Sequence, residues 1–238
     1  MIVKKPYAIV ELFNTAKDVD VLRLKAIDDA TLSFDPGMFV MLIYKDPASG
    51  AEISRAFSLA SSPDSKTLDF IIAMIHGQFT SKLDVAKPGD VLYVSGPHGQ
   101  FKFDANKDKK VLFLAGGTGL APFISMLRLI REKNLQIDVN LIYSIKHPDE
   151  IILKEELESY VKDLGMKMTI TVTRDDGAES WTGEKGHIDA NMISRHAPDF
   201  LERGAYICGP LNFVKAMKDA LVSIKYPADK ISADVWGH

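Results

Sequence analysis

Apolar and polar positions follow a two-residue period in much of the first hundred residues. From residue 21 to 26, for example, apolar side chains alternate with Arg23 and Lys25. Short apolar stretches bounded by turn signals such as Asp35-Pro36-Gly37 are typical of β-strands. Strands are predicted at 7–12, 21–26, 38–44, 56–60, 68–75 and 91–94. Since no long helical pattern interrupts them, we expect a small antiparallel β-barrel.

The period changes after a polar and charged segment at residues 104–110. Apolar runs then alternate with stretches in which apolar residues recur every three or four positions. These patterns predict strands at 111–115, 137–143, 167–172 and 205–208, and helices at 120–132, 151–164 and 210–225. Such alternation favours a parallel sheet with helices on both faces. We therefore expect two domains, an antiparallel barrel at 1–104 and an α/β domain at 105–238.

The composition limits the kinds of protein and partner. Hydrophobic residues make up 46% of the 238 positions and charged residues 26%, which is ordinary for a globular protein. The formal net charge of −3 gives no reason to expect nucleic acid or an anionic membrane as a partner. No apolar run approaches the ~20 residues of a membrane span, and no secretion signal opens the sequence. We therefore expect a cytoplasmic protein.

Cysteine and histidine usage argues against metal centres. Cys208 is the sole cysteine, so these residues cannot hold a disulfide framework or a Cys-ligated iron–sulfur cluster. The six histidines show no paired ligand spacing, so we expect no metal site.

A glycine-rich segment follows the first strand of the second half. The apolar run 111–115 leads into Gly116-Gly117-Thr118-Gly119, and Pro122 lies at the start of a helical stretch. Strand, glycine turn and helix aim backbone N–H groups and a helix N-terminus at a phosphate. Pro122 occupies the place of the third glycine in the strict dinucleotide pattern, so an ordinary tight turn is the alternative interpretation.

Two segments of the first half carry groups suited to a phosphate or a planar ring. Arg55-Ala56-Phe57-Ser58 combines a cation, an aromatic ring and a hydroxyl on one predicted strand. A two-residue period puts Arg55 and Phe57 on one face, and an arginine can grip a diphosphate with a forked hydrogen bond. Gly77 leads to Thr80 and Ser81, which we expect to cap a short helix. The alternatives are an exposed arginine beside a core phenylalanine, and a plain helix cap.

Five short motifs occur in order along the chain. They are Arg55-x-Phe57-Ser58, Gly77-x-x-Thr80, Gly96-Pro97-x-Gly99-x-Phe101, Gly116-Gly117-Thr118-Gly119-x-Ala121-Pro122 and Cys208-Gly209-Pro210. Together they resemble the ferredoxin–NADP reductase superfamily of flavoproteins over essentially the whole chain. The resemblance implies an antiparallel FAD-binding barrel followed by a Rossmann-like domain for a nicotinamide nucleotide. We expect the third motif to form a tight turn that closes the barrel.

On the flavin side, the resemblance implies a role for each matching residue. Arg55 would bind the FAD diphosphate, Phe57 would pack on the flavin or its ribityl chain, and Ser58 would hydrogen-bond flavin N5, the atom that accepts hydride. Thr80 and Ser81 would add phosphate contacts. The implied cofactor-binding set is completed by Leu59, Met74 and Gly77.

On the nucleotide side, the turn formed by Gly117, Thr118, Gly119 and Pro122 would cradle the diphosphate. The resemblance places Cys208 against the nicotinamide, with Gly209 leaving room for the ring. A small buried core cysteine is the alternative reading of Cys208.

The C-terminal residues resemble the family's ending, in which a carboxylate precedes an aromatic residue by two positions. Here Asp234 stands in place of the usual glutamate and Trp236 is the aromatic residue. The resemblance implies a proton relay through the carboxylate and stacking of the aromatic ring on the flavin. The shorter aspartate and the following Gly237-His238 leave open the relay and whether Trp236 or His238 covers the ring. A solvent-exposed tail is the alternative.

The second strand of the predicted parallel sheet bears on the choice of nucleotide. NAD-binding units of this type carry an acidic residue near that strand's end, which holds the ribose 2′-hydroxyl. Here the strand ends with Ser144 and Lys146 instead, and Arg174 follows the next strand. Two cations could meet a 2′-phosphate, so NADPH is favoured over NADH, although both cations could equally be surface residues.

The resemblance implies an FAD-dependent NAD(P)H oxidoreductase that moves hydride between nicotinamide C4 and flavin N5. It would pass single electrons to a separate carrier such as ferredoxin or flavodoxin, or to a partner subunit. The alternatives are a non-catalytic electron-transfer subunit of a larger redox complex and an NAD(P)H reductase of free flavin or quinone.

Overall fold

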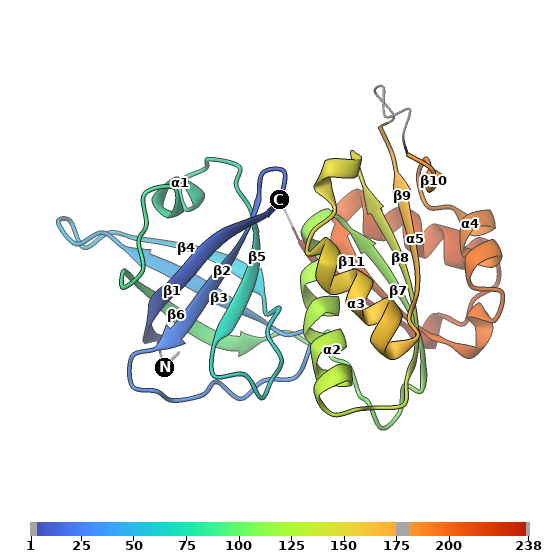
Figure 1. Ribbon diagram of the computed structural model, residues 1–238, viewed down its shortest axis with the longest axis horizontal. Helices are drawn as coiled ribbons and strands as arrows, with labels where there is room; N and C mark the ends of the chain where they lie inside the picture. The colour runs from blue at the N-terminus through green and yellow to red at the C-terminus, as the bar shows by residue number, and fades with distance from the viewer. Residues whose placement is uncertain (1–3, 175–180, 237–238) are drawn as a thin grey trace.

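Two six-stranded sheets lie side by side in the structure, a computed structural model that describes residues 4–174 and 181–236 (Figure 1). The first sheet has the order β4-β3-β6-β1-β2-β5, and all its neighbouring strands are antiparallel. Its elements are β1 (Lys4–Ala16), β2 (Val19–Ala26), β3 (Phe39–Lys45), β4 (Glu52–Ser58), β5 (Leu68–Ala73), the short helix α1 (Thr80–Leu83) and β6 (Val91–His98). The expected antiparallel architecture is confirmed.

Two local expectations for this sheet are wrong. The strand expected at 56–60 runs from Glu52 to Ser58, and the expected turn at Gly96-Pro97 lies inside β6. Pairing decides the second case, because β6 pairs with β3 as far as the contact between Phe39 and His98. A Cβ on Gly96 would lie 2.9 Å from a Val40 side-chain carbon. The glycine therefore permits close strand approach instead of starting a turn.

The second sheet is parallel, with the order β10-β9-β8-β7-β11-β12. Its strands are β7 (Lys110–Gly116), β8 (Asp138–Ile145), β9 (Lys167–Val172), β10 (Glu184–Lys185), β11 (Gly204–Pro210) and β12 (Ile231–Trp236). Its helices are α2 (Ala121–Glu132), α3 (Lys154–Leu164), α4 (Ala190–His196) and α5 (Leu211–Ser223), and 3₁₀ turns occupy Gly117–Leu120, Pro148–Glu150, Phe200–Glu202 and Ala228–Lys230. The expected α/β class is confirmed.

Helices cover both faces of the parallel sheet (Figure 1). Along β7, Phe113 packs in the apolar cluster that contains α2 and α3 residues, whereas Leu112 and Leu114 pack in the cluster of α4 and α5. Successive strand residues point to opposite faces, so a continuous apolar run fills both clusters. In the described part of the chain, no helix is long and apolar enough to cross a lipid bilayer.

Three elements of the second half were not anticipated. The two-residue strand β10 is too short to leave a periodic pattern, and α4 has only seven residues. The edge strand β12 has the mixed sequence ISADVW, whose composition does not mark it as a strand. It forms a strand because it pairs with β11. These elements depend on contacts between distant segments and not on local preference.

The two sheets share one apolar core at their junction. A single buried cluster combines Val21, Ala60 and Ile71 from the barrel side with Phe123 and Ile124 from α2. Backbone contacts add to it, since the Lys17 N–H donates to the Asp149 carbonyl at 3.1 Å. The halves therefore meet through a packed interface.

Candidate active site

The flavin-side motif lies on the edge strand β4 of the barrel. Arg55 is exposed, and its Nη1 donates to the neighbouring Ser54 carbonyl at 2.8 Å. Within the described residues no carboxylate forms an ion pair with Arg55. Phe57 is half-buried against Phe79, with ring centroids 5.5 Å apart, so the motif meets the segment before α1. An unneutralised guanidinium therefore stands beside an aromatic pair.

Ser58 ends β4 in the neighbourhood of the third motif. In the β3–β4 register Ser58 is opposite Phe39, whose ring lies 5.6 Å from that of His98. A Cβ on Gly99 would approach the same Phe39 ring at 3.1 Å. The Arg55–Ser58 and Gly96–Phe101 motifs are thus brought together across β3.

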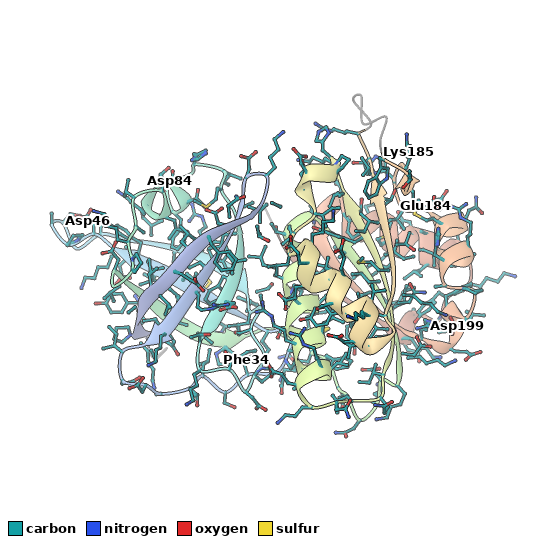
Figure 2. All side chains as sticks on the ribbon, viewed as in Figure 1. Phe34, Asp46, Asp84, Glu184, Lys185 and Asp199 are labelled. Atoms are coloured by element: carbon teal, nitrogen blue, oxygen red, sulfur yellow. The ribbon has the colours of Figure 1, made fainter. Side chains whose placement is uncertain are left out.

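The segment before α1 is held by its own side chains. The Gly77 N–H donates to Thr80 Oγ1 at 2.9 Å, and Thr80 is the first residue of α1, where no side-chain cap forms. The expected hydroxyl cap is therefore wrong, because the Thr80 hydroxyl closes the preceding turn. His76 Nδ1 pairs at 2.9 Å with Asp84, which is labelled in Figure 2 at the end of α1. Ser81 remains exposed at the start of this helix.

The glycine turn packs on the end of β11. Gly117 adopts φ +54°, and a Cβ there would meet nothing within 4 Å. A Cβ on Gly119 would overlap the Cys208 carbonyl oxygen and lie 2.7 Å from Gly209 Cα. The backbone of the turn therefore has open space beside it at Gly117 and is packed tightly against β11 at Gly119. This arrangement brings together the fourth and fifth motifs.

Cys208 and Asp234 are register partners on β11 and β12. Burial, and after it the neighbouring charge of Asp234, raises the pKa of the Cys208 thiol well above its usual value. The thiol therefore stays protonated at neutral pH and cannot act as a nucleophile. Burial also raises the pKa of Asp234, against a backbone hydrogen bond from Val235. Cys208 offers a small neutral contact, and Asp234 holds a proton to higher pH than an exposed aspartate does.

Helix α2 brings the two sets of motifs together. It begins directly after the 3₁₀ turn Gly117–Leu120, and the Ser125 hydroxyl donates to the Ser61 carbonyl at 2.7 Å. Ser61 is three residues beyond Ser58. The flavin-side strand end and the nucleotide-side turn are therefore fixed on the same helix.

Two members of the implied set pack with the barrel core. Leu59 is fully buried in the barrel core, and its N–H donates to the Met38 carbonyl. Met74 lines a hollow of about 350 Å³ together with Leu12 and Leu83 and with no other candidate residue. A larger hollow of about 550 Å³ lies beside α1 and meets the site residues through Phe79.

The candidate nucleotide-selecting residues lie at the carboxyl ends of the neighbouring strands β8 and β9. Ser144 is buried opposite Gly116, and the Arg174 N–H donates to the Lys146 carbonyl at 2.9 Å. The side chains of Lys146 and Arg174 are exposed. Sequence reasoning missed Glu150, whose carboxylate accepts the Lys146 N–H at 3.1 Å. Its position four residues past the cation was the available signal, and it adds an acid beside the two cations.

The chain's end is described as far as the backbone of Trp236. Register places Trp236 opposite Pro210, in line with the Cys208 motif. His238, the other candidate for covering the ring, lies outside the described residues.

The residues present fit an FAD and a dinucleotide. Arg55 offers an exposed, unneutralised cation, and the open side of Gly117 leaves its backbone accessible. The close packing of Gly119 on Cys208 brings that open backbone beside the end of β11. A diphosphate needs such donors and close backbone approach.

Comparison with known proteins also divides the chain into an FAD-binding part and an NAD-binding part. The oxidoreductase FAD-binding domain model matches residues 6–103, and the oxidoreductase NAD-binding domain model matches residues 113–219. The ferredoxin–NADP reductase B of Sorangium cellulosum is 32% identical over 174 residues, covering 72% of this chain and 70% of that protein. Fold and sequence thus define an oxidoreductase with an FAD-binding and an NAD-binding domain. The chain belongs to the ferredoxin–NADP reductase family.

Other relatives extend the comparison. The glycine betaine monooxygenase reductase subunit of Pseudomonas aeruginosa is 30% identical over 232 residues, which cover 96% of this chain and 63% of that protein. This chain thus spans about three fifths of the length of the monooxygenase reductase subunits that it matches. The FAD/NAD-binding domain of the Vibrio cholerae nitric oxide dioxygenase has the same fold, with TM-score 0.87, 17% identity and coverage of 98% and 99% of the two chains.

Proposed function

We propose that this chain is an FAD-dependent NAD(P)H oxidoreductase that passes electrons to a separate one-electron carrier. The flavin supplies hydride acceptance at N5 and single-electron release, and the protein orients the two cofactors. The observation that carries the proposal is the meeting, through α2, of the β4 end with the turn on β11. The flavin-side motif and the nucleotide-side turn, which are far apart in sequence, thereby lie at the same junction between the two sheets.

On the flavin side, Arg55 binds the diphosphate and Phe57 covers the ring system. The exposed, unpaired state of Arg55 and the half-burial of Phe57 support these roles. Ser58 hydrogen-bonds N5 and fixes the geometry of hydride transfer. Ser81 contacts phosphate, whereas Gly77 and Thr80 act by closing the turn before α1. Leu59 and Met74 contribute through packing.

On the nucleotide side, the backbone at Gly117–Gly119 holds the diphosphate, and Pro122 fixes the start of α2. Cys208 and Gly209 border the nicotinamide, and Asp234 holds a proton near it. The resemblance implies that Trp236 would cover the flavin until the nicotinamide enters.

The two cations that follow the carboxyl ends of β8 and β9 support NADPH as the preferred nucleotide. Lys146 and Arg174 are exposed there, close to the buried Ser144. Glu150 could hold the 2′-hydroxyl of NADH instead, so nucleotide titration decides between them.

Domain limits at 1–104 and 105–238 belong to the same proposal and are supported by the two separate sheets. The carrier is a ferredoxin, a flavodoxin or a partner subunit, since one cysteine cannot ligate an iron–sulfur cluster within these residues. We place the reaction in the cytoplasm, where NAD(P)H is available, and cell fractionation tests that location.

The role of Ser58 is tested by stopped-flow reduction of the FAD-loaded protein. Removing one preorganised hydrogen-bond donor costs on the order of 100-fold in rate, so Ser58→Ala should slow flavin reduction about that much. Nucleotide and FAD affinity should change little. Ser54→Ala, an exposed serine on the same strand, is the matched control. Unchanged reduction kinetics in Ser58→Ala would remove this role.

A further inference from the structure

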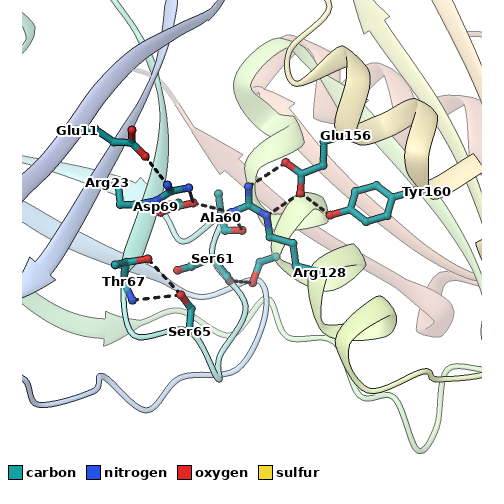
Figure 3. A network of polar contacts seen from close by, with 11 residues as sticks. Glu11, Arg23, Ala60, Ser61, Ser65, Thr67, Asp69, Arg128, Glu156 and Tyr160 are labelled. Atoms are coloured by element: carbon teal, nitrogen blue, oxygen red, sulfur yellow. Dashed lines mark hydrogen bonds and ion pairs between the residues drawn. The ribbon is translucent and has the colours of Figure 1, made fainter. Parts of the chain in front are cut away.

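An arginine on α2 joins the two sheets through a partly buried polar network (Figure 3). Arg128 Nη1 donates to Asp69 Oδ2 on β5 at 2.9 Å and to the Ala60 carbonyl at 3.1 Å. Its Nε and Nη2 donate to the two oxygens of Glu156 on α3, at 2.8 and 2.9 Å. The side chain of Arg128 is 14% exposed and that of Asp69 is 4% exposed. One guanidinium therefore ties the barrel to two helices of the parallel sheet.

Both carboxylates of the network have a second partner. Asp69 accepts two further hydrogen bonds from Arg23, at 2.8 and 2.9 Å, and Glu156 accepts one from the Tyr160 hydroxyl. Burial opposes ionisation of Glu156, but its bonds to Arg128 and Tyr160 outweigh burial and lower its pKa. At neutral pH Glu156 is therefore ionised.

The helix that carries Arg128 also carries the candidate nucleotide turn at its start. α2 follows directly on the 3₁₀ turn of residues 117–120, and Ser125 and Arg128, one helical turn apart, bind the carbonyls of residues 61 and 60. Those carbonyls are three and two positions beyond Ser58. A short, rigid path thus connects the candidate N5 partner with the candidate diphosphate turn.

The contacts at the junction divide into two kinds. Apolar burial holds the halves together, but it depends on area and fixes no direction. Forked, charge-assisted hydrogen bonds are directional. A buried ion pair adds little net stability compared with apolar residues, yet breaking it is costly, which penalises other arrangements of the halves. The network is therefore suited to setting the relative position of the halves.

We propose that Arg128 is a positioning residue, which fixes the nucleotide turn relative to Ser58 so that the nicotinamide reaches the flavin in reactive geometry. This inference rests on the proposed function. A misplacement of about 1 Å can cost about 100-fold in rate. Because Arg128 would not touch the nucleotide itself, we expect nucleotide binding to be retained. The signature of Arg128 is therefore a loss of reduction rate at saturating nucleotide.

The first test measures flavin reduction by stopped flow in Arg128→Met and in the control Arg23→Met. Both changes remove an arginine from Asp69, but the bonds of Arg23 to Asp69 and Glu11 all lie within the barrel. We expect Arg128→Met to reduce about 100-fold more slowly, with the nucleotide Kd within about 3-fold, and Arg23→Met to stay near the wild-type rate. Arg128→Lys should rescue only in part, because lysine lacks the fork. A wild-type rate in Arg128→Met, or equal slowing in Arg23→Met, overturns the proposal.

A second variant distinguishes an effect of Arg128 on the relative position of the two halves from an effect on protein stability. Arg128→Met leaves Glu156 without its cation, whereas Arg128→Met with Glu156→Gln removes that charge and keeps the Tyr160 partner. The double variant should recover thermal stability while its reduction rate stays low. Recovery of the rate together with the melting temperature would make Arg128 merely structural and overturn the proposal.

A measurement without nucleotide reads the relative position of the halves directly. Spin labels on Val10→Cys in β1 and Val161→Cys in α3, both exposed positions, report the distance between the halves while Cys208 is buried. We expect a narrow distance distribution in the otherwise wild-type protein and a broadened one with Arg128→Met. An unchanged distribution overturns the proposal. If neither nucleotide reduces the wild type, the proposed function fails, while this distance still decides whether Arg128 fixes the halves.

Discussion

The edge strand β4 and the β5–α2 junction each present an arginine, and the two environments are opposite. Arg55 is exposed and donates to one backbone carbonyl, whereas Arg128 is largely covered and shares its donors among two carboxylates and a carbonyl. Four of the five N–H donors of Arg128 are bonded within the fold, so this guanidinium has little capacity left for a ligand. A guanidinium left open on a strand edge has that capacity. The contrast supports our proposal that Arg55 on β4 binds a ligand, whereas Arg128 maintains the architecture of the junction.

The largest expected effect concerns the open arginine. Arg55→Met should weaken FAD binding by about 100-fold, since hydrogen bonds to charged groups contribute about 1.5–3 kcal/mol each. The stability of the FAD-free protein should change by no more than about 0.5 kcal/mol, because the side chain is exposed. Titration of the FAD-free protein with FAD, followed by flavin fluorescence, measures the affinity. Lys45→Met, an exposed cation on the adjacent strand, is the control, and equal weakening in both would break the contrast.

The glycine turn offers the same contrast within three residues. Gly119→Ala should destabilise the protein by about 1–3 kcal/mol and weaken nucleotide binding, because its Cβ has no space against β11. Gly117→Asn should be tolerated, since asparagine adopts positive φ and a side chain there enters open space. Thermal unfolding and nucleotide titration compare the two variants. If Gly119→Ala were as stable as wild type, the close contact with Cys208 would be refuted.

The smallest expected effect is a pH dependence from Asp234. Burial raises its folded pKa above the ordinary 3.8, so the folded protein binds more protons than the unfolded chain over that interval. Its stabilising contribution is complete below the ordinary pKa and is lost as pH rises through the folded pKa. Asp234→Asn should therefore be more stable than wild type at neutral pH, and the difference should shrink in acid. Melting temperatures measured from pH 3 to 8 test this, and a difference independent of pH would contradict it.

Much of the fold could be predicted from the sequence because it is encoded by local periodicity. The strand at 167–172 was predicted with its observed bounds, and α2 and α3 were placed to within a few residues. The motifs also gave the two sheet classes through their resemblance to a family. Local patterns were least reliable at Gly96-Pro97, where pairing with β3 overrides turn chemistry.

The site could be predicted only where its residues are contiguous. Arg128 contacts Asp69 and Glu156, which lie 59 and 28 positions away, so no spacing signal marks them. Thr80 was expected to face a ligand, but its hydroxyl bonds to Gly77. Glu150 escaped notice because it is the last residue of a 3₁₀ turn, which brings its carboxylate back to the Lys146 N–H. Contacts that depend on folded geometry leave no trace in the linear pattern.

The most direct test of the account is an anaerobic titration of the FAD-loaded protein with NADPH and then with NADH, followed by visible absorbance. The account predicts a flavin spectrum that is bleached by a stoichiometric amount of nucleotide, with NADPH effective at lower concentration. Preference for NADH would mean that Glu150, and not Lys146 and Arg174, selects the nucleotide. A protein that takes up no FAD, or whose flavin neither nucleotide bleaches, would contradict the central claim.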